Sequence, residues 1–362
     1  MGDRNSPSDQ LSGGLNDLLT PSFDSRPLRI AIIYDCLYPH SIGGAERWYR
    51  SLAGRLRLRH KITYLTRTQW RSPMALDAPD GVEVIGLGAA APLYNDAGRR
   101  RIDVPLRFAA RVFMHLLRNR ASYDVIHTCS FPYFPMIAAS IVRKLGGPPI
   151  VVDWFEVWPR NYWRRYLGGN RGSIAALIQR LCITLTNSAI TFSQANAKQL
   201  QSNGYRGQLD ILQGMYDAPL DLGEPNPIRQ PQIVFVGRHI SEKNVRAIPA
   251  AIAATLEAIP DLKCVIFGDG PERSNVIEAI RTAGLQQHIE CPGFVPWETV
   301  DQALREAMCL LLPSEREGYG LAVIEAAARG TPSVVVRAGN NAATELIREG
   351  VNGYIAENSS PI

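Results

Sequence analysis

Hydrophobic and polar positions follow two alternating patterns along the chain, and together they predict strands separated by helices. Residues 29–35 form a short, nearly continuous apolar run, which is typical of a strand buried on both faces of a parallel sheet. Similar runs follow at 62–65, 82–85, 125–128, 150–153 and 189–192. Most are separated by stretches with the apolar period of a helix, at 45–58, 106–117, 136–145 and 173–184. This alternation predicts a doubly wound α/β domain.

The alternation stops at residues 216–231, where four prolines and no regular period indicate a linker. It then resumes, with strands predicted at 233–236, 263–267, 289–290, 309–312 and 333–336 and helices at 245–258, 272–283, 298–307 and 320–328. The polar composition of residues 1–27, at the start of the chain, predicts a disordered tail. We therefore expect two Rossmann-like domains, 28–215 and 232–362, that face each other across a ligand cleft.

Composition agrees with a soluble globular protein of two-domain size. The 362 residues are 46% hydrophobic and 20% charged, and no apolar run approaches the roughly 20 residues of a membrane span. None of the six cysteines stands in C-x-x-C spacing, so neither a zinc site nor a disulfide framework is indicated. We expect no bound metal and a reducing, cytoplasmic environment.

Charge is distributed unevenly. Residues 1–200 contain 26 Lys and Arg against 14 Asp and Glu, whereas residues 201–362 contain 13 against 20. Arg107, Arg111 and Arg118 share one stripe of a predicted helix, with basic clusters at 99–101 and 47–61. This predicts either contact with the inner, anionic face of a membrane, where a lipid-linked or phosphorylated acceptor would be met, or an ordinary solvated helix face. No motif that reads nucleic acid accompanies the basic residues, so no nucleic-acid partner is expected.

Glycine-rich loops follow several predicted strands. Gly43 and Gly44 come after the first strand and directly before a helix, where free N–H groups favour an anion. A glycine pair is a weak signal by itself, and the alternative is a simple tight turn. Gly268 and Val295 follow later strands and lie where backbone groups could border a nucleotide base, or in ordinary turns.

Two cations and two carboxylates lie close to predicted strand ends in the second half. Arg238 ends a strand and Lys243 starts a helix, so both can neutralise a diphosphate leaving group unless they are merely solvated. Glu317 precedes a helix and Glu325 lies within it, and a carboxylate accepts two hydroxyl hydrogen bonds from a sugar or ribose. The alternative is that both simply cap the helix. The backbone N–H groups that could bind an anion there belong to Gly318, Gly320 and Leu321.

Taken in order, these motifs resemble glycosyltransferase family 4. The resemblance covers roughly residues 28–357 and implies a GT-B fold, a nucleoside-diphosphate sugar as donor, no metal, and retention of configuration at the transferred carbon. It implies that Arg238 and Lys243 hold the diphosphate, Glu317 the sugar and Glu325 the ribose, while Val295 borders the base and Gly44 approaches from the first domain. The sequence has no D-x-D pair at a strand end, in agreement with a metal-independent member.

The sequence departs from the family pattern on the acceptor side. His127 is retained, but Cys129 stands where similar proteins have a second histidine, and Phe155 occupies another histidine position. His127 either orients a hydroxyl or is a satisfied strand-end histidine. The substitute acceptor residues that we expect are Asp153, Glu156 and the aromatic platform around Trp158, although these rings could equally be loop packing. The chain also ends earlier than similar proteins, so its C-terminal domain looks shortened.

The sequence thus predicts a retaining glycosyltransferase that modifies a glycan, lipid-linked or small-molecule acceptor, in cell-envelope polysaccharide or glycoconjugate synthesis. The candidate catalytic residues are Arg238, Lys243, Glu317 and His127. Two alternatives remain open: a non-catalytic subunit that binds a nucleotide sugar, and a sugar-nucleotide epimerase. An epimerase would convert the donor without any acceptor.

Overall fold

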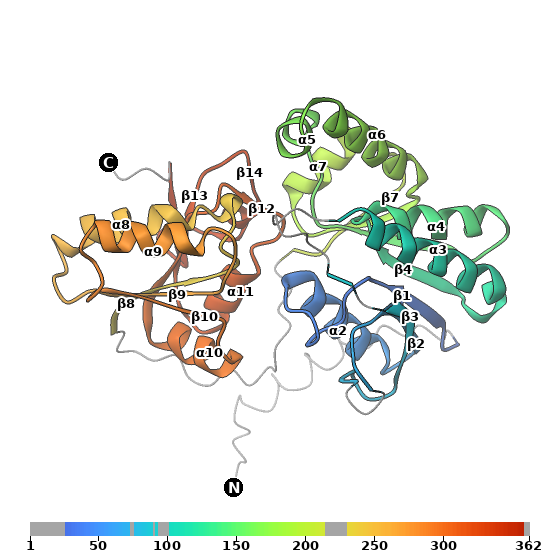
Figure 1. Ribbon diagram of the computed structural model, residues 1–362, viewed down its shortest axis with the longest axis horizontal. Helices are drawn as coiled ribbons and strands as arrows, with labels where there is room; N and C mark the ends of the chain where they lie inside the picture. The colour runs from blue at the N-terminus through green and yellow to red at the C-terminus, as the bar shows by residue number, and fades with distance from the viewer. Residues whose placement is uncertain (1–25, 73–75, 90, 93–100, 214–229, 358–362) are drawn as a thin grey trace, which may run out of the picture.

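The N-terminal domain is built on a seven-stranded parallel sheet. The computed structural model describes residues 26–72, 76–89, 91–92, 101–213 and 230–357 (Figure 1). The strand order is β3-β2-β1-β4-β5-β6-β7. The strands are β1 (Arg29–Ile33), β2 (Lys61–Thr68), β3 (Val82–Ala89), β4 (Val125–Cys129), β5 (Ile150–Trp154), β6 (Ser188–Thr191) and β7 (Gln208–Ile211).

Both faces of this sheet are covered, which explains its continuous apolar strands. Along β1, Ala31 and Ile33 pack into a core shared with helices α3 (Asp103–Arg118), α4 (Tyr133–Lys144) and α6 (Gly169–Leu185). The alternate residues Ile30 and Ile32 pack on the opposite face against α2 (Gly44–Leu56). Successive side chains of a strand point to opposite faces, so both sets must be apolar. The remaining helices are α5 (Arg160–Leu167), which packs on α6, and α7 (Gln194–Ser202) beside β6 and β7.

The C-terminal domain repeats this architecture with a six-stranded parallel sheet of order β10-β9-β8-β11-β13-β15. Its strands are β8 (Gln230–Val236), β9 (Lys263–Phe267), β10 (Ile289–Gly293), β11 (Ala307–Leu312), β13 (Ser333–Val336) and β15 (Gly353–Ala356). Its helices are α8 (Ile248–Leu256), α9 (Arg273–Thr282), α10 (Trp297–Glu306) and α11 (Leu321–Ala328). A two-stranded ladder of β12 (Arg316–Glu317) and β14 (Asn340–Asn341) lies beside the N-terminal domain (Figure 1).

The predicted fold class is confirmed: two doubly wound parallel-sheet domains face each other. In each domain the strand order reverses direction beside the first strand, between β1 and β4 and between β8 and β11, where ligands bind in such sheets. Most of the predicted tail (1–27) and linker (216–231) lies outside the described residues. β8 begins at Gln230, before the predicted end of the linker.

Several elements differ from the prediction. The sequence patterns did not indicate α5, α7, β7, β12, β14 or β15, because these elements are short or lie at a sheet edge, where polar residues interrupt the period. The helix predicted from residue 245 begins as α8 at Ile248, after two 3-10 turns around Asn244, whose φ of 47° is left-handed. No helix of the described residues is both long and apolar enough to span a bilayer.

Candidate functional site

The two domains meet along a surface that we call the seam, formed by α2, α5 and α7 on one side and by β12, β14 and α11 on the other (Figure 1). A Cβ atom on Gly44 would lie 3.9 Å from the Leu321 side chain, so α2 and α11 approach closely. Gly43 caps α2, and a Cβ atom there would collide with the Glu46 carboxylate. The start of α2 thus lies in contact with α11 of the C-terminal domain at Gly44.

The predicted pair Lys243 and Glu317 is brought into contact. The ammonium group of Lys243 forms an ion pair with Oε1 of Glu317, and Ser314 Oγ donates a hydrogen bond to the same oxygen at 2.7 Å. Glu317 is buried and Lys243 is partly buried. A cation and a carboxylate are thus held together at the C-terminal side of the seam, each able to exchange its partner for a charged or hydroxylated ligand.

Arg238 lies exposed directly after β8, at the end of the sheet where ligands bind. The loop after β8, which holds Arg238, packs tightly against the loop after β9, which begins at Gly268. The φ of Gly268 is +111°, and a Cβ atom there would lie 1.9 Å from the Gly237 carbonyl oxygen. His239, which the sequence analysis did not single out, is fully buried in this loop, and burial lowers its pKa below the ordinary value. A glycine is required at 268 so that the two loops can stack behind Arg238.

Glu325 is buried in α11 and pairs with the opposite domain. Its Oε1 lies 2.7 Å from Nη1 of Arg47 in α2. The Arg47 guanidinium also lies 5.4 Å from the ring centre of Trp297, two residues after Val295. Val295 is partly buried and packs against the core of the C-terminal domain. The carboxylate expected to hold ribose therefore forms an ion pair across the seam in this structure.

His127 and Asp153 lie together inside the N-terminal domain. His127 Nε2 is 2.9 Å from Asp153 Oδ1, and Trp48 Nε1 donates a hydrogen bond to Oδ2 at 2.9 Å. Asp153 is fully buried, so its carboxylate orients His127 and Trp48 and has no surface to offer an acceptor. The direct acceptor contact that we expected of Asp153 is not available in this arrangement.

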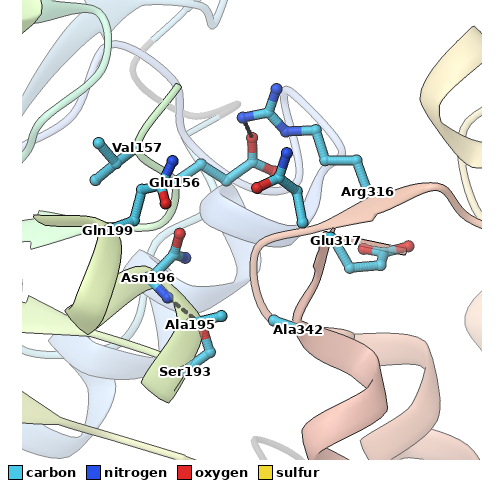
Figure 2. Close-up of a pocket in the computed structure, with 11 residues that line it drawn as sticks. Glu156, Val157, Ser193, Ala195, Asn196, Gln199, Arg316, Glu317 and Ala342 are labelled. Carbon is cyan, nitrogen blue, oxygen red and sulfur yellow. Dashed lines mark hydrogen bonds and ion pairs between the residues drawn. The ribbon is translucent and has the colours of Figure 1, made fainter. Parts of the chain in front are cut away.

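Glu156 and Trp158 surround a guanidinium group from the other domain. Arg316 of β12 forms a 2.8 Å ion pair with Glu156, as Figure 2 shows, and lies 4.5 Å from the Trp158 ring and 4.3 Å from the Tyr162 ring. Trp158 Nε1 also donates to Glu156 at 2.6 Å, and Tyr162 donates its hydroxyl to Glu242. Burial opposes ionisation of Glu242, but hydrogen bonds from Tyr162 and Ser241 keep its pKa below the ordinary value.

Two further contacts close this end of the seam. Asn196 of α7 donates to the carbonyl oxygens of Phe155 and Gly318, the latter at 3.2 Å. Glu345 accepts hydrogen bonds at 2.7 Å from the first two N–H groups of α7. A Cβ atom on Gly318 would lie 2.4 Å from the Phe155 carbonyl oxygen, while Gly320 starts α11 with a left-handed φ of 82°. Both glycines are therefore required by the fold of the seam itself.

A small polar pocket opens among these contacts (Figure 2). It is lined from both domains, by Glu156, Ser193, Asn196, Gln199, Arg316 and Glu317. Of the residues predicted to bind the donor, the structure places Gly44, Lys243, Glu317 and Glu325 at the seam. Of those predicted to meet the acceptor, it places Glu156 and Trp158 there.

The sequence analysis did not identify Arg47, Arg316 and Glu345 as site residues. Their only signal in the sequence was a charged residue within or near a motif. No cluster of potential metal ligands occurs in the part of the chain that the structure describes.

Known families match both domains. The family model described as "Glycosyl transferase 4-like domain" matches residues 43–211, and the model "Glycosyl transferases group 1" matches residues 223–362. Together the two matches cover most of the chain.

The chain spans less than two thirds of the length of the first curated relatives that it matches. The chain is 31% identical over 253 residues to 2-deoxystreptamine N-acetyl-D-glucosaminyltransferase of Niallia circulans, a match that covers 66% of this chain and 64% of the relative. It is 30% identical over 142 residues to poly(glycerol-phosphate) alpha-glucosyltransferase of Bacillus subtilis, which covers 39% of this chain and 21% of that relative.

Solved structures share the fold across nearly the whole chain. Sucrose-phosphate synthase of Thermosynechococcus elongatus superposes with a TM-score of 0.72 and 18% identity, covering 92% of this chain and 87% of that one. HepE of Anabaena in complex with UDP and glucose superposes with a TM-score of 0.68 and 18% identity, covering 92% and 86%. With both domains matched by family models and the two-domain fold shared with GT-B structures, the chain belongs to the group 1 glycosyltransferases, of the family 4 type.

Proposed function

We propose that this protein transfers a sugar from a nucleoside diphosphate to an acceptor hydroxyl group. The observation that carries the proposal is the contact of Lys243 with the buried Glu317 at the seam, together with a second buried carboxylate, Glu325, that pairs with Arg47 of the opposite domain. Cations that neutralise a leaving diphosphate and carboxylates that accept sugar hydroxyls are the groups that glycosyl transfer needs. The relatives named above are glycosyltransferases, in agreement with this activity.

In the proposed reaction, the diphosphate of the donor takes Lys243 and Arg238 as counter-ions. Glu317, released from Lys243, accepts hydrogen bonds from the sugar, and Glu325 exchanges Arg47 for the ribose hydroxyls. Two cations supply the counter-charge that a metal ion gives in other sites, so we propose a metal-independent reaction.

We propose that transfer retains the configuration of the sugar. The bond from the anomeric carbon to the phosphate oxygen breaks, the acceptor oxygen bonds to the same face, and the acceptor proton passes to the departing phosphate. A double displacement would require a carboxylate beside the anomeric carbon. Glu317 is the nearest carboxylate to Lys243, and after its release from Lys243 its Oε1 still accepts a hydrogen bond from Ser314, in agreement with a binding role.

We propose a glycan, lipid-linked or small-molecule acceptor in cell-envelope polysaccharide or glycoconjugate synthesis, on the cytoplasmic face of a membrane. The acceptor would enter at Glu156 and Trp158, which Arg316 contacts across the seam. His127, held by Asp153, is proposed to orient the acceptor hydroxyl or the sugar from the N-terminal side.

Thermal unfolding of the full chain with UDP-, GDP-, ADP- and TDP-sugars tests the donor class, because a ligand that binds only the folded state raises the Tm. One nucleotide series should stabilise the protein, and no stabilisation by any of them contradicts the proposal. With that donor, acceptor screening should release free nucleoside diphosphate, and the rate should be unchanged by EDTA. NMR of the product should show the anomeric configuration of the donor.

The same experiment separates the alternatives. Conversion of the donor sugar with no acceptor present would identify an epimerase. Binding of the donor without release of nucleoside diphosphate, in every acceptor tested, would identify a non-catalytic subunit.

A further inference from the structure

Helices α3, α4 and α6 form the outer layer of the N-terminal domain, and their solvent side carries large apolar residues. α4 packs between the other two, and Figure 1 shows α3 and α4 on the side of the domain remote from the C-terminal domain. Although this side faces solvent, it exposes Leu106, Met114, Ile141, Ile174, Leu177 and Leu181. We call the solvent side of α3, α4 and α6 the outer face.

The stripe on α6 is the most unusual part of the outer face. Ile174, Leu177 and Leu181 are 59%, 68% and 48% exposed and are spaced by three and four residues, so they form one line along the helix. The buried side of α6 packs into the domain core through Cys182 and Ile183. α6 is therefore apolar on both sides. Exposure of its outer apolar side to water is unfavourable, and such a surface is typical of an interaction site.

The helices of the outer face, and α5 beside them, are strongly basic. Helices α3, α4, α5 and α6 contain ten Lys and Arg residues but a single carboxylate, Asp103, which already pairs with Arg101 and Arg107. Arg171 and Arg180 lie exposed on α6 itself, and Lys144 lies exposed at the end of α4. The potential of the outer face is therefore strongly positive.

We propose that the outer face docks on the surface of a membrane rich in anionic lipids, with Ile174, Leu177 and Leu181 inserted at the boundary between head groups and acyl chains. Exposed leucines and isoleucines flanked by arginines match both parts of such a surface, the apolar interior and the anionic phosphates. A second copy of this chain is a poorer partner, because two outer faces would bring like charges together.

This inference rests on the proposed function, and it places the acceptor side of the seam next to the membrane surface. α6 packs against α5, and α5 carries Tyr162, which contacts Arg316 and Glu242 at the seam. The acceptor side of the seam is thus joined directly to the docked layer. A lipid-linked acceptor whose lipid remains in the bilayer would present its head group beside Glu156 and Trp158.

Vesicle flotation of the full-length protein tests the inference. Vesicles of phosphatidylcholine with about one third phosphatidylglycerol should carry the protein upward, and vesicles of phosphatidylcholine alone should not. The double variant L177E/L181E should lower the bound fraction at least fivefold. The matched control V351E changes a side chain that is 70% exposed on the C-terminal domain and should bind as the unaltered protein does. Equal flotation with both vesicle types overturns the inference. So does a bound fraction of L177E/L181E that equals that of the unaltered protein.

Two further readouts keep the outcomes separate. Analytical ultracentrifugation should show the same mass for the unaltered protein and L177E/L181E, whereas a dimer that this variant converts to a monomer would assign the outer face to self-association and overturn the inference. The nucleotide sugar should raise the Tm of L177E/L181E as much as that of the unaltered protein, which also shows that the variant is folded. K243A should lose this stabilisation but still float. A protein that floats but binds no nucleotide sugar contradicts the proposed function alone.

Discussion

The two domains share one architecture but hold their functional side chains in different ways. In the C-terminal domain, Lys243 ends a 3-10 turn that follows β8 and Glu317 lies in the short strand β12, and the two contact each other within the domain. In the N-terminal domain, Asp153 is buried within the sheet, and Glu156 is fixed by Arg316 from the other domain. We call Lys243 and Glu317, with the Glu325 proposed to hold ribose, the donor half, and Glu156 with Trp158, proposed to meet the acceptor, the acceptor half. The comparison teaches that the Lys243–Glu317 pair forms within one domain, whereas the surroundings of Glu156 and Trp158 are completed only where the domains meet.

The largest effect should follow from removing the cation of the donor half. Lys243→Ala should lower kcat/KM about 100- to 1,000-fold, because a leaving diphosphate loses a preorganised counter-charge. The control Lys263→Ala removes an exposed lysine of the same domain, which donates to the Gln287 carbonyl group, and should leave kcat/KM within about twofold. A loss of activity confined to KM for the acceptor would show that Lys243 does not belong to the donor half.

Glu325 and Arg47 should affect nucleotide binding in opposite directions. Glu325→Gln should weaken binding of the nucleoside diphosphate about tenfold, because the amide is a poorer acceptor for the ribose hydroxyls. Arg47→Ala should strengthen binding by a few-fold, because it removes the ion pair that ribose must displace. Titration calorimetry measures both, with Arg50→Ala, which loses a pair with Asp77 one turn further along the same helix, as the control. Weaker binding in both Glu325→Gln and Arg47→Ala would contradict this exchange.

Arg316 should act on the acceptor half alone. Arg316→Lys keeps the charge but loses the planar group that packs against Trp158 and Tyr162, so the acceptor KM should rise about fivefold. Donor affinity should stay unchanged, and the exposed pair Arg337–Glu357 offers Arg337→Lys as a control. If the substitution lowers donor affinity as much as acceptor affinity, Arg316 serves both halves of the site and this prediction is wrong.

The smallest effect concerns pH and the loop behind Arg238. His239 has a lowered pKa in the folded state, so below its ordinary value of about 6.5 the unfolded chain binds a proton that the folded chain does not. The free energy of unfolding should therefore fall as the pH drops from 7 to 5, by at most about 1.4 kcal/mol per pH unit from this group. His239→Gln should flatten that dependence in urea titrations. An unchanged slope would show that His239 titrates alike in both states.

Much of the donor half was predictable because its side chains depend on local backbone geometry. The order of strand, loop and helix fixes where Lys243 and Glu317 lie, and a glycine such as Gly268 is required where one loop packs on another. The same rules predicted both sheets. They missed β7 and α7, whose polar residues hide the apolar period at a sheet edge.

The acceptor half could not be derived in this way. Asp153 and Glu156 are three residues apart, yet one is buried against His127 and the other reaches Arg316, which is 160 positions further along the chain. Nothing in the spacing of a sequence specifies a contact between domains. The pairing of Arg47 with Glu325 has the same origin, since it depends on how α2 approaches α11.

The central claim is that Lys243, Glu317 and Glu325 together hold a nucleoside-diphosphate sugar at the seam. A crystal structure of the protein with the nucleotide sugar that gives the largest rise in Tm tests it most directly. We expect the Lys243 ammonium group within about 3 Å of a phosphate oxygen and Glu325 within hydrogen-bond distance of the ribose, with Arg47 displaced. A nucleotide bound elsewhere, with the Lys243–Glu317 and Arg47–Glu325 pairs both intact, would contradict the account.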